Sequence, residues 1–233
     1  LYPDNSYSLV ENFLKMTFGN YAEDYAQNSV VTQALDTLLL LHADHEQNCS
    51  TSTVRLVGSS NANIFASVAS GINALSGPSH GGANEAAMEM IEGFTSADHA
   101  EKEMMGKLER KEKIMGFGHA IYSESDPRND IIKSWSEKLA ADVGDTVLYP
   151  VSVRCEEVMK CEKGLFCNAD FFHASAYSFM KIPTKLFTPI FVMSRLTGWS
   201  AHVMEQRADN RIIRPSADYI GEKLRPVVTI ENR

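Results

Sequence analysis

Histidines at three junctions of this 233-residue chain could carry acid–base chemistry on an anionic substrate. Glycine and polar residues gather at positions 48–53, 76–84 and 116–129, between stretches of helical periodicity. His45, His80 and His119 lie in or beside these junctions. Loops at helix ends often carry chemistry while the helices hold them in place. The pattern therefore predicts one site assembled from distant turns.

The first junction leaves several chemistries open. His42 and His45 lie three residues apart, so one helical face could present both to a metal, with Glu46 nearby. The H-x-x-H spacing is a weak indicator by itself. The serines and threonine at 50–52 could supply a nucleophile, or the segment could bind a carboxylate. The structural alternative is that Asp44 and the serines cap a helix and that His42 is a core residue.

The second junction places His80 beside Gly81 and Gly82, just before a predicted helix. Glycines let a ligand approach the backbone closely. The positive end of the following helix is expected to lower the pKa of His80 and keep it neutral. The alternative is an exposed histidine in a glycine-rich turn.

The third junction again puts a histidine, His119, after a flexible Gly116-x-Gly118 backbone. This is not a dinucleotide fingerprint, because no strand precedes it and the third glycine is missing. Arg128 follows Asp126 and Pro127 in the first turn of a predicted helix, where its charge opposes the helix dipole. That placement indicates a nearby anion, with an ordinary salt bridge as the alternative.

Three further charged residues complete the set. Asp170 lies among aromatic residues, which should raise its pKa and suit it to act as a base, although it could simply cap a helix. Arg195 lies on an otherwise apolar helix and needs a partner, and Arg214 precedes a proline. Since arginine recognises carboxylates in a bidentate manner, the residues together predict a pocket for a di- or tricarboxylate.

Helices must position these residues. The periodicity predicts an all-α protein with helices at 29–42, 64–75, 84–91, 97–113, 126–144, 151–163, 171–180 and 183–205. Ser29 is expected to cap the first of these, and Gly144 to close the fifth. One short strand is predicted at 226–230.

The chain resembles the citrate synthase family over nearly its whole length. Six motifs carry the resemblance in order: Asp44-His45-Glu46, Gly77-Pro78-Ser79-His80-Gly81, Gly116-Phe117-Gly118-His119, Asp126-Pro127-Arg128, Asn168-Ala169-Asp170 and Ile213-Arg214-Pro215. The stretches 125–129 and 207–219 look most like the 2-methylcitrate synthase branch.

The resemblance implies an α-helical homodimer with a citrate synthase-like fold of two domains. The large domain would comprise 1–81 and 182–233, and the small domain 82–181. The family chain has a further N-terminal part of the large domain, so we expect this sequence to start inside the family chain, at a truncation point or as a fragment.

The implied reaction joins propionyl-CoA to oxaloacetate and hydrolyses the thioester, with acetyl-CoA, as in citrate synthase, as the alternative. By the resemblance, Asp170 is the base, His80 donates to the thioester oxygen and His119 polarises the ketone of oxaloacetate. The residues implied to hold the oxaloacetate carboxylates are His45, Arg128, Arg195 and Arg214. The last of these would reach the partner subunit's site.

The segment implied to receive coenzyme A consists of Lys113, Ile114, Met115, Gly116 and Phe117. Ala120 and Ser123 stand where several relatives have basic residues, so the missing positive charge would come either from the N-terminal part of the family chain or from Lys111. The resemblance implies no metal and no resident cofactor; the coenzyme A thioester is a substrate.

Composition limits the remaining choices. There are 22 Lys and Arg against 30 Asp and Glu, a formal charge of -8, which argues against a nucleic-acid-binding protein. No apolar run approaches the ~20 residues that span a bilayer. Four cysteines without a C-x-x-C pair favour free thiols and the cytoplasm. The non-enzymatic alternative is a helical metal-binding or structural protein.

Overall fold

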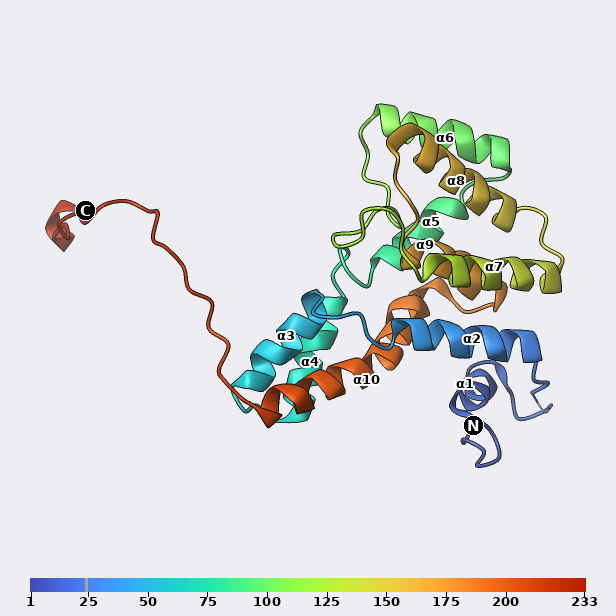
Figure 1. Ribbon diagram of the computed structural model, residues 1–233, viewed down its shortest axis with the longest axis horizontal. Coiled ribbons are helices and arrows are strands. Elements are labelled where there is room, and N and C mark those ends of the chain that lie inside the picture. The colour runs from blue at the N-terminus through green and yellow to red at the C-terminus, as the bar shows by residue number, and fades with distance from the viewer. Residues whose placement is uncertain (24) are drawn as a thin grey trace.

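A computed structural model describes residues 1–23 and 25–233 (Figure 1). Those residues contain helices and no strand, which confirms the all-α prediction. The α-helices are α1 (Leu9–Phe18), α2 (Ser29–His42), α3 (Cys49–Ser59), α4 (Ile64–Leu75), α5 (Ala83–Ile91), α6 (Ala97–Glu109), α7 (Asn129–Val143), α8 (Leu148–Lys163), α9 (Ala169–Phe179) and α10 (Phe187–Ala208). Two 3₁₀ turns are η1 (Thr184–Leu186) and η2 (Ile230–Asn232).

Asparagine side chains set the start of four helices. Asn28, Asn48, Asn63 and Asn168 cap α2, α3, α4 and α9 by accepting backbone N–H groups of the first turn. The cap of α2 is therefore the residue before the serine that the sequence indicated. Gly144 closes α7 in the left-handed conformation, as predicted.

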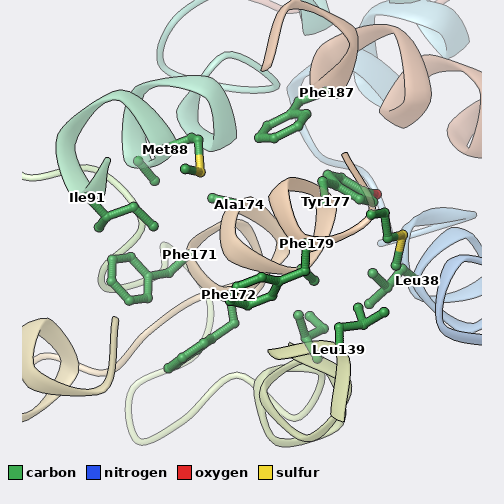
Figure 2. Close-up of a cluster of buried hydrophobic side chains, with 14 of the residues drawn as sticks. Leu38, Met88, Ile91, Leu139, Phe171, Phe172, Ala174, Tyr177, Phe179 and Phe187 are labelled. Atoms are coloured by element: carbon green, nitrogen blue, oxygen red, sulfur yellow. The ribbon is translucent and has the colours of Figure 1, made fainter. Parts of the chain in front are cut away.

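Helix α9 lies at the centre of the larger hydrophobic core (Figure 2). Its Phe171 and Phe172 are fully buried, and α5 and α7 pack against the same helix. Burying each such ring contributes roughly 1.5–3 kcal/mol. Because Asp170 immediately precedes these rings, the core fixes the position of its backbone.

A second, smaller core joins α3, α4 and α10 around Val54, Leu75 and Trp199. Gly71 permits the close approach, since a Cβ there would lie 2.5 Å from Cγ2 of Val54. This packing holds the N-terminal end of α3 and the middle of α10 together, next to the turn that carries His45.

Several predicted boundaries were wrong. Residues 49–53, assigned to a junction, form the start of α3, whose Ser- and Thr-rich sequence gains its cap from Asn48 and its packing from α4 and α10. Helix α7, predicted from 126, begins at Asn129, because the Asp126 carboxylate accepts hydrogen bonds from Arg128. The helix predicted at 97–113 ends at Glu109, and α1 was not predicted.

Beyond Ala208 the chain leaves the helices as an extended arm (Figure 1). The strand predicted at 226–230 does not form, because no second strand lies beside it among the described residues. Apolar side chains of the arm are exposed, among them Ile220 and Leu224. Within the described part of the chain, no helix is long and apolar enough to cross a membrane.

Candidate active site

The histidines of all three junctions and Asp170 surround two adjoining cavities. The larger has a volume of about 650 Å³, the smaller about 120 Å³, and both are lined by His45, His80, His119 and Asp170. The smaller cavity is also lined by Arg128 and Arg195. The structure thus brings together six of the predicted site residues, from segments up to 150 positions apart in the chain.

Asp170 lies in the first turn of α9, after the capping residue Asn168. Its backbone carbonyl accepts a hydrogen bond from Nδ2 of Asn84, while its carboxylate makes no hydrogen bond to any described residue. Burial raises the pKa of Asp170 to about 6, against the opposing charges of Arg128 and Arg195. A carboxylate with this raised pKa is a stronger base than an ordinary carboxylate and is still mostly ionised at pH 7.

His80 is a neutral hydrogen-bond donor. The backbone N–H of Ser50 points at its Nε2 over 3.4 Å, and the Ser50 hydroxyl lies 2.9 Å from the same nitrogen. Because an amide N–H only donates, Nε2 accepts and the proton resides on Nδ1. Burial, assisted by Arg195, lowers the pKa of His80 to about 4. The predicted direction is confirmed, but the cause is burial and not the helix N-terminus.

His119 has the opposite tautomer. Its Nδ1 accepts hydrogen bonds from the backbone N–H groups of Ile121 at 3.1 Å and Tyr122 at 3.3 Å, which leaves the proton on Nε2. Burial lowers the pKa of His119. The preceding turn needs glycine: Gly116 has φ +89, and a Cβ there would lie 2.9 Å from the ring of Phe171.

Arg128 is held by a buried carboxylate. Its Nε and Nη2 donate to Oδ1 and Oδ2 of Asp126 at 2.9 and 2.7 Å, and the Asp126 side chain is fully buried. Asp126 Oδ2 also accepts the backbone N–H of Ala169 at 3.0 Å. The salt bridge that the sequence left as an alternative is therefore present, and it fixes Arg128 at the wall of the smaller cavity.

Arg195 is 1% exposed and has no carboxylate partner among the described residues. Its Nε donates to the carbonyl of His42 at 2.7 Å, and its guanidinium lies 4.8 Å from the ring centroid of Phe191. Burial lowers the pKa of Arg195 to about 10, so it stays charged at neutral pH. A buried cation in this state favours an anion in the cavity that it lines.

A sequence profile described as "Citrate synthase, C-terminal domain" matches residues 1–216. The chain belongs to the citrate synthase family. It is 62% identical over 208 residues to a 2-methylcitrate synthase of Shewanella oneidensis, covering 89% of this chain and 56% of that one. It is 47% identical over 244 residues to citrate synthase 1 of Mycobacterium tuberculosis, covering 100% and 57%. The chain thus spans a little over half the length of these relatives.

Solved structures agree with this membership of the citrate synthase family. A Thermoplasma acidophilum citrate synthase in ternary complex with carboxymethyl coenzyme A and oxaloacetate superposes with a TM-score of 0.88. It is 32% identical, and the match covers 99% of this chain and 61% of that one. The citrate synthase fold predicted from the motifs is therefore present.

The turn that carries His45 is held by one face of α10. Arg195 donates to the carbonyl of His42, the Gly198 N–H donates to the carbonyl of Ala43 at 3.2 Å, and His202 Nε2 lies 3.0 Å from Oδ1 of Asp44. His202 is not among the residues predicted from the sequence, although 195, 198 and 202 share one helical face at a spacing that could have indicated it.

His42 is a core residue, as the alternative to a metal ligand predicted. Its ring is stacked between His173 and Phe191, with ring centroids 4.0 and 4.2 Å away, and burial holds its pKa well below the usual range. No group of three or more His, Cys, Asp or Glu is placed to hold a metal ion within residues 1–23 and 25–233. The four cysteines are free thiols.

The remaining predicted residues divide into two sets. The segment predicted for coenzyme A lines the larger cavity: Lys113, Ile114, Met115, Gly116 and Phe117. Among the described lining residues, Lys113 is the one lysine or arginine, and Lys111 does not line the cavity. Arg214 lies on the exposed arm and lines neither cavity.

Proposed function

We propose that this chain carries the condensing site of a 2-methylcitrate synthase, which joins propionyl-CoA to oxaloacetate and hydrolyses the resulting thioester. The observation that carries the proposal is Asp170, a base with a raised pKa, which faces the smaller cavity together with two neutral histidines and the buried Arg195, which has no carboxylate partner among the described residues. The propionyl preference rests on the 62% identity to a 2-methylcitrate synthase, against 47% to a citrate synthase.

The first step would be removal of a proton from the carbon next to the thioester carbonyl. Such a proton is very weakly acidic, so a carboxylate removes it only if the negative charge developing on the oxygen is stabilised. Asp170 would take the proton, and Nδ1–H of His80 would donate to the thioester oxygen. A histidine with its pKa near 4 keeps this donor without becoming a competing acid.

The second step would form the carbon–carbon bond. The enol or enolate carbon attacks the ketone carbon of oxaloacetate, while Nε2–H of His119 donates to the ketone oxygen and protonates the developing alkoxide. Arg128, Arg195 and His45 would hold the carboxylates, which fits their positions around the smaller cavity. Water then attacks the thioester carbonyl and releases coenzyme A.

We place coenzyme A in the larger cavity, along 113–117, with Lys113 beside its anionic part. No resident cofactor and no metal take part in the proposed reaction. The alternative of a metal-binding protein predicts that a chelator abolishes binding or stability, whereas the condensing enzyme keeps its activity in a chelator.

We also propose a homodimer in which Arg214 completes the partner subunit's site. The arm leaves the helical body and exposes Ile220 and Leu224, side chains that a second copy could cover.

The proposed small domain, 82–181, contains α5 to α9. Within it, α6 packs on α8 and α7 packs on α9. The segments 1–81 and 182–233 form the proposed large domain. The free thiols are consistent with a cytoplasmic location.

The deciding experiment compares kcat/KM for propionyl-CoA and acetyl-CoA with oxaloacetate, following release of the coenzyme A thiol. One methyl group in an apolar pocket is worth roughly 1–3 kcal/mol, so we expect activity with both and a preference of about 10- to 200-fold for propionyl-CoA. A preference for acetyl-CoA would assign the chain to citrate synthase. No release of coenzyme A with either thioester would refute the condensing function.

A further inference from the structure

Tyr122 lies behind the histidines of the proposed oxaloacetate site. Its hydroxyl oxygen and Nε2 of His45 are 2.8 Å apart, and its ring centroid is 4.7 Å from that of His119. Its backbone N–H donates to Nδ1 of His119. Yet Tyr122 lines neither cavity. It therefore contacts two site histidines without occupying the space of a substrate.

The contact with His45 has a consequence for hydrogen bonding. Burial lowers the pKa of His45 to about 4, so its ring carries one proton at neutral pH. A substrate carboxylate only accepts hydrogen bonds, and the ring nitrogen left for it is Nδ1, which bonds to no described residue. His45 can donate from Nδ1 only if Nε2 is unprotonated, and an unprotonated Nε2 needs a donor beside it. A phenol hydroxyl is such a donor.

We propose that Tyr122 is a positioning residue whose hydroxyl donates to Nε2 of His45 and fixes His45 as an Nδ1–H donor to the substrate. This inference rests on the proposed oxaloacetate site. Its ring at the same time braces His119, whose Nδ1 is already taken by two backbone N–H groups. Tyr122 thus favours opposite protonated nitrogens in two neighbouring histidines: Nδ1 in His45 through its hydroxyl, and Nε2 in His119 through its backbone N–H together with that of Ile121.

The substitution Tyr122→Phe isolates the hydroxyl, because it keeps the ring against His119 and the backbone N–H. One net hydrogen bond corresponds to a roughly threefold to tenfold change in affinity. We expect the Kd and KM for oxaloacetate to rise by that factor, with kcat changed less than twofold. Tyr149→Phe is the matched control: its hydroxyl bonds to no described residue, and it should alter neither constant.

Two readouts separate positioning from a general structural effect. Nitrogen-15 NMR of ring-labelled histidines in the unliganded full chain, with the His45 signal assigned by its loss in His45→Gln, should show Nδ1–H in the wild type and a shift toward Nε2–H in Tyr122→Phe. In a double-mutant cycle, Tyr122→Phe should not weaken oxaloacetate binding further in the His45→Gln background.

Three outcomes would each overturn the inference: a wild-type His45 protonated on Nε2, an unchanged affinity of Tyr122→Phe for oxaloacetate, or additive effects in the double-mutant cycle. A wild-type chain that does not bind oxaloacetate would instead remove the proposed function. The NMR measurement needs no ligand, so it still decides whether the Tyr122 hydroxyl sets the protonated nitrogen of His45.

Discussion

Asp126 accepts hydrogen bonds from the Arg128 guanidinium with both carboxylate oxygens, at 2.9 and 2.7 Å. One of these oxygens also accepts the backbone N–H of Ala169, the first residue of α9. The pair connects the start of α7, beside the arginine that we propose binds substrate, to the start of α9, which provides Asp170. Because the Asp126 side chain is fully buried, no water can replace it. The relative placement of cation and base therefore depends on this one carboxylate.

Asp126→Asn should consequently damage both stability and substrate binding. Removing one partner of a buried ion pair costs about 3–5 kcal/mol, and the neutral amide cannot accept on both sides. We expect urea denaturation to show a loss of that size and the KM for oxaloacetate to rise at least tenfold. Asp130→Asn, one turn further on the exposed side of α7, is the control and should change the free energy of unfolding by less than 0.5 kcal/mol.

Asp170→Asn should abolish the chemistry while keeping the fold. The amide has nearly the same shape but cannot take a proton from the acyl group. We expect kcat to fall by roughly 10³-fold or more, whereas the Kd for oxaloacetate stays within threefold, since the residues proposed to hold its carboxylates are unchanged. Near-normal turnover in this variant, with intact circular dichroism, would exclude Asp170 as the base.

The same carboxyl group should set the acidic limb of the pH profile. Asp170 must be ionised to act, and its pKa is about 6, while those of His80 and His45 lie near 4. We therefore expect kcat/KM to fall tenfold per pH unit below about pH 6, with no further break until the histidines protonate near pH 4. A limb centred near pH 4 would mean that Asp170 has an ordinary carboxyl pKa.

Asp170 also makes the unliganded fold less stable at neutral pH. Its folded pKa of about 6 lies above the value near 3.9 of an unfolded chain, so ionisation of this carboxyl group favours the unfolded chain. The stability that its protonated form provides is fully present below pH 4, and the free energy of unfolding falls as the pH rises through 6. Asp170→Asn should thus raise the free energy of unfolding by about 3 kcal/mol at pH 7.5. Thermal unfolding at pH 7.5 and pH 4 tests this, because the difference should vanish at the lower pH.

Sequence patterns indicated candidate site residues that lie together in the structure, but not the contacts that hold them. Asp170, His80 and His119 stand out locally, beside aromatic rings or glycines, and the structure places them around shared cavities. Tyr122 gave no signal, and the helical spacing of His202 does not show what it contacts, because the contacts Tyr122–His45 and His202–Asp44 join residues 77 and 158 positions apart. Such pairs become visible only when the helices pack.

Local reasoning also failed where packing overrides it. The Ser- and Thr-rich start of α3 looks like a loop, yet it is helical because Asn48 caps it and because the buried Ser50 accepts a hydrogen bond from the Trp199 ring N–H. Conversely, residues 226–230 have strand-forming side chains but no neighbouring strand among the described residues, so a correct propensity produced a wrong prediction.

Arg195→Met should separate stability from binding. Arg195 is buried and lacks a carboxylate partner among the described residues, and replacing a buried charge by an apolar side chain of similar volume is often neutral or stabilising. We expect the free energy of unfolding to fall by no more than 1 kcal/mol, the remaining cost being the hydrogen bond to the His42 carbonyl. The oxaloacetate carboxylate would lose its buried cation, so the Kd for oxaloacetate should rise at least 100-fold.

Arg154→Met, on the exposed face of α8, controls for the loss of one positive charge and should leave the Kd for oxaloacetate unchanged. If Arg195→Met unfolds the chain, the arginine is a structural residue; if it binds oxaloacetate normally, the anion lies elsewhere.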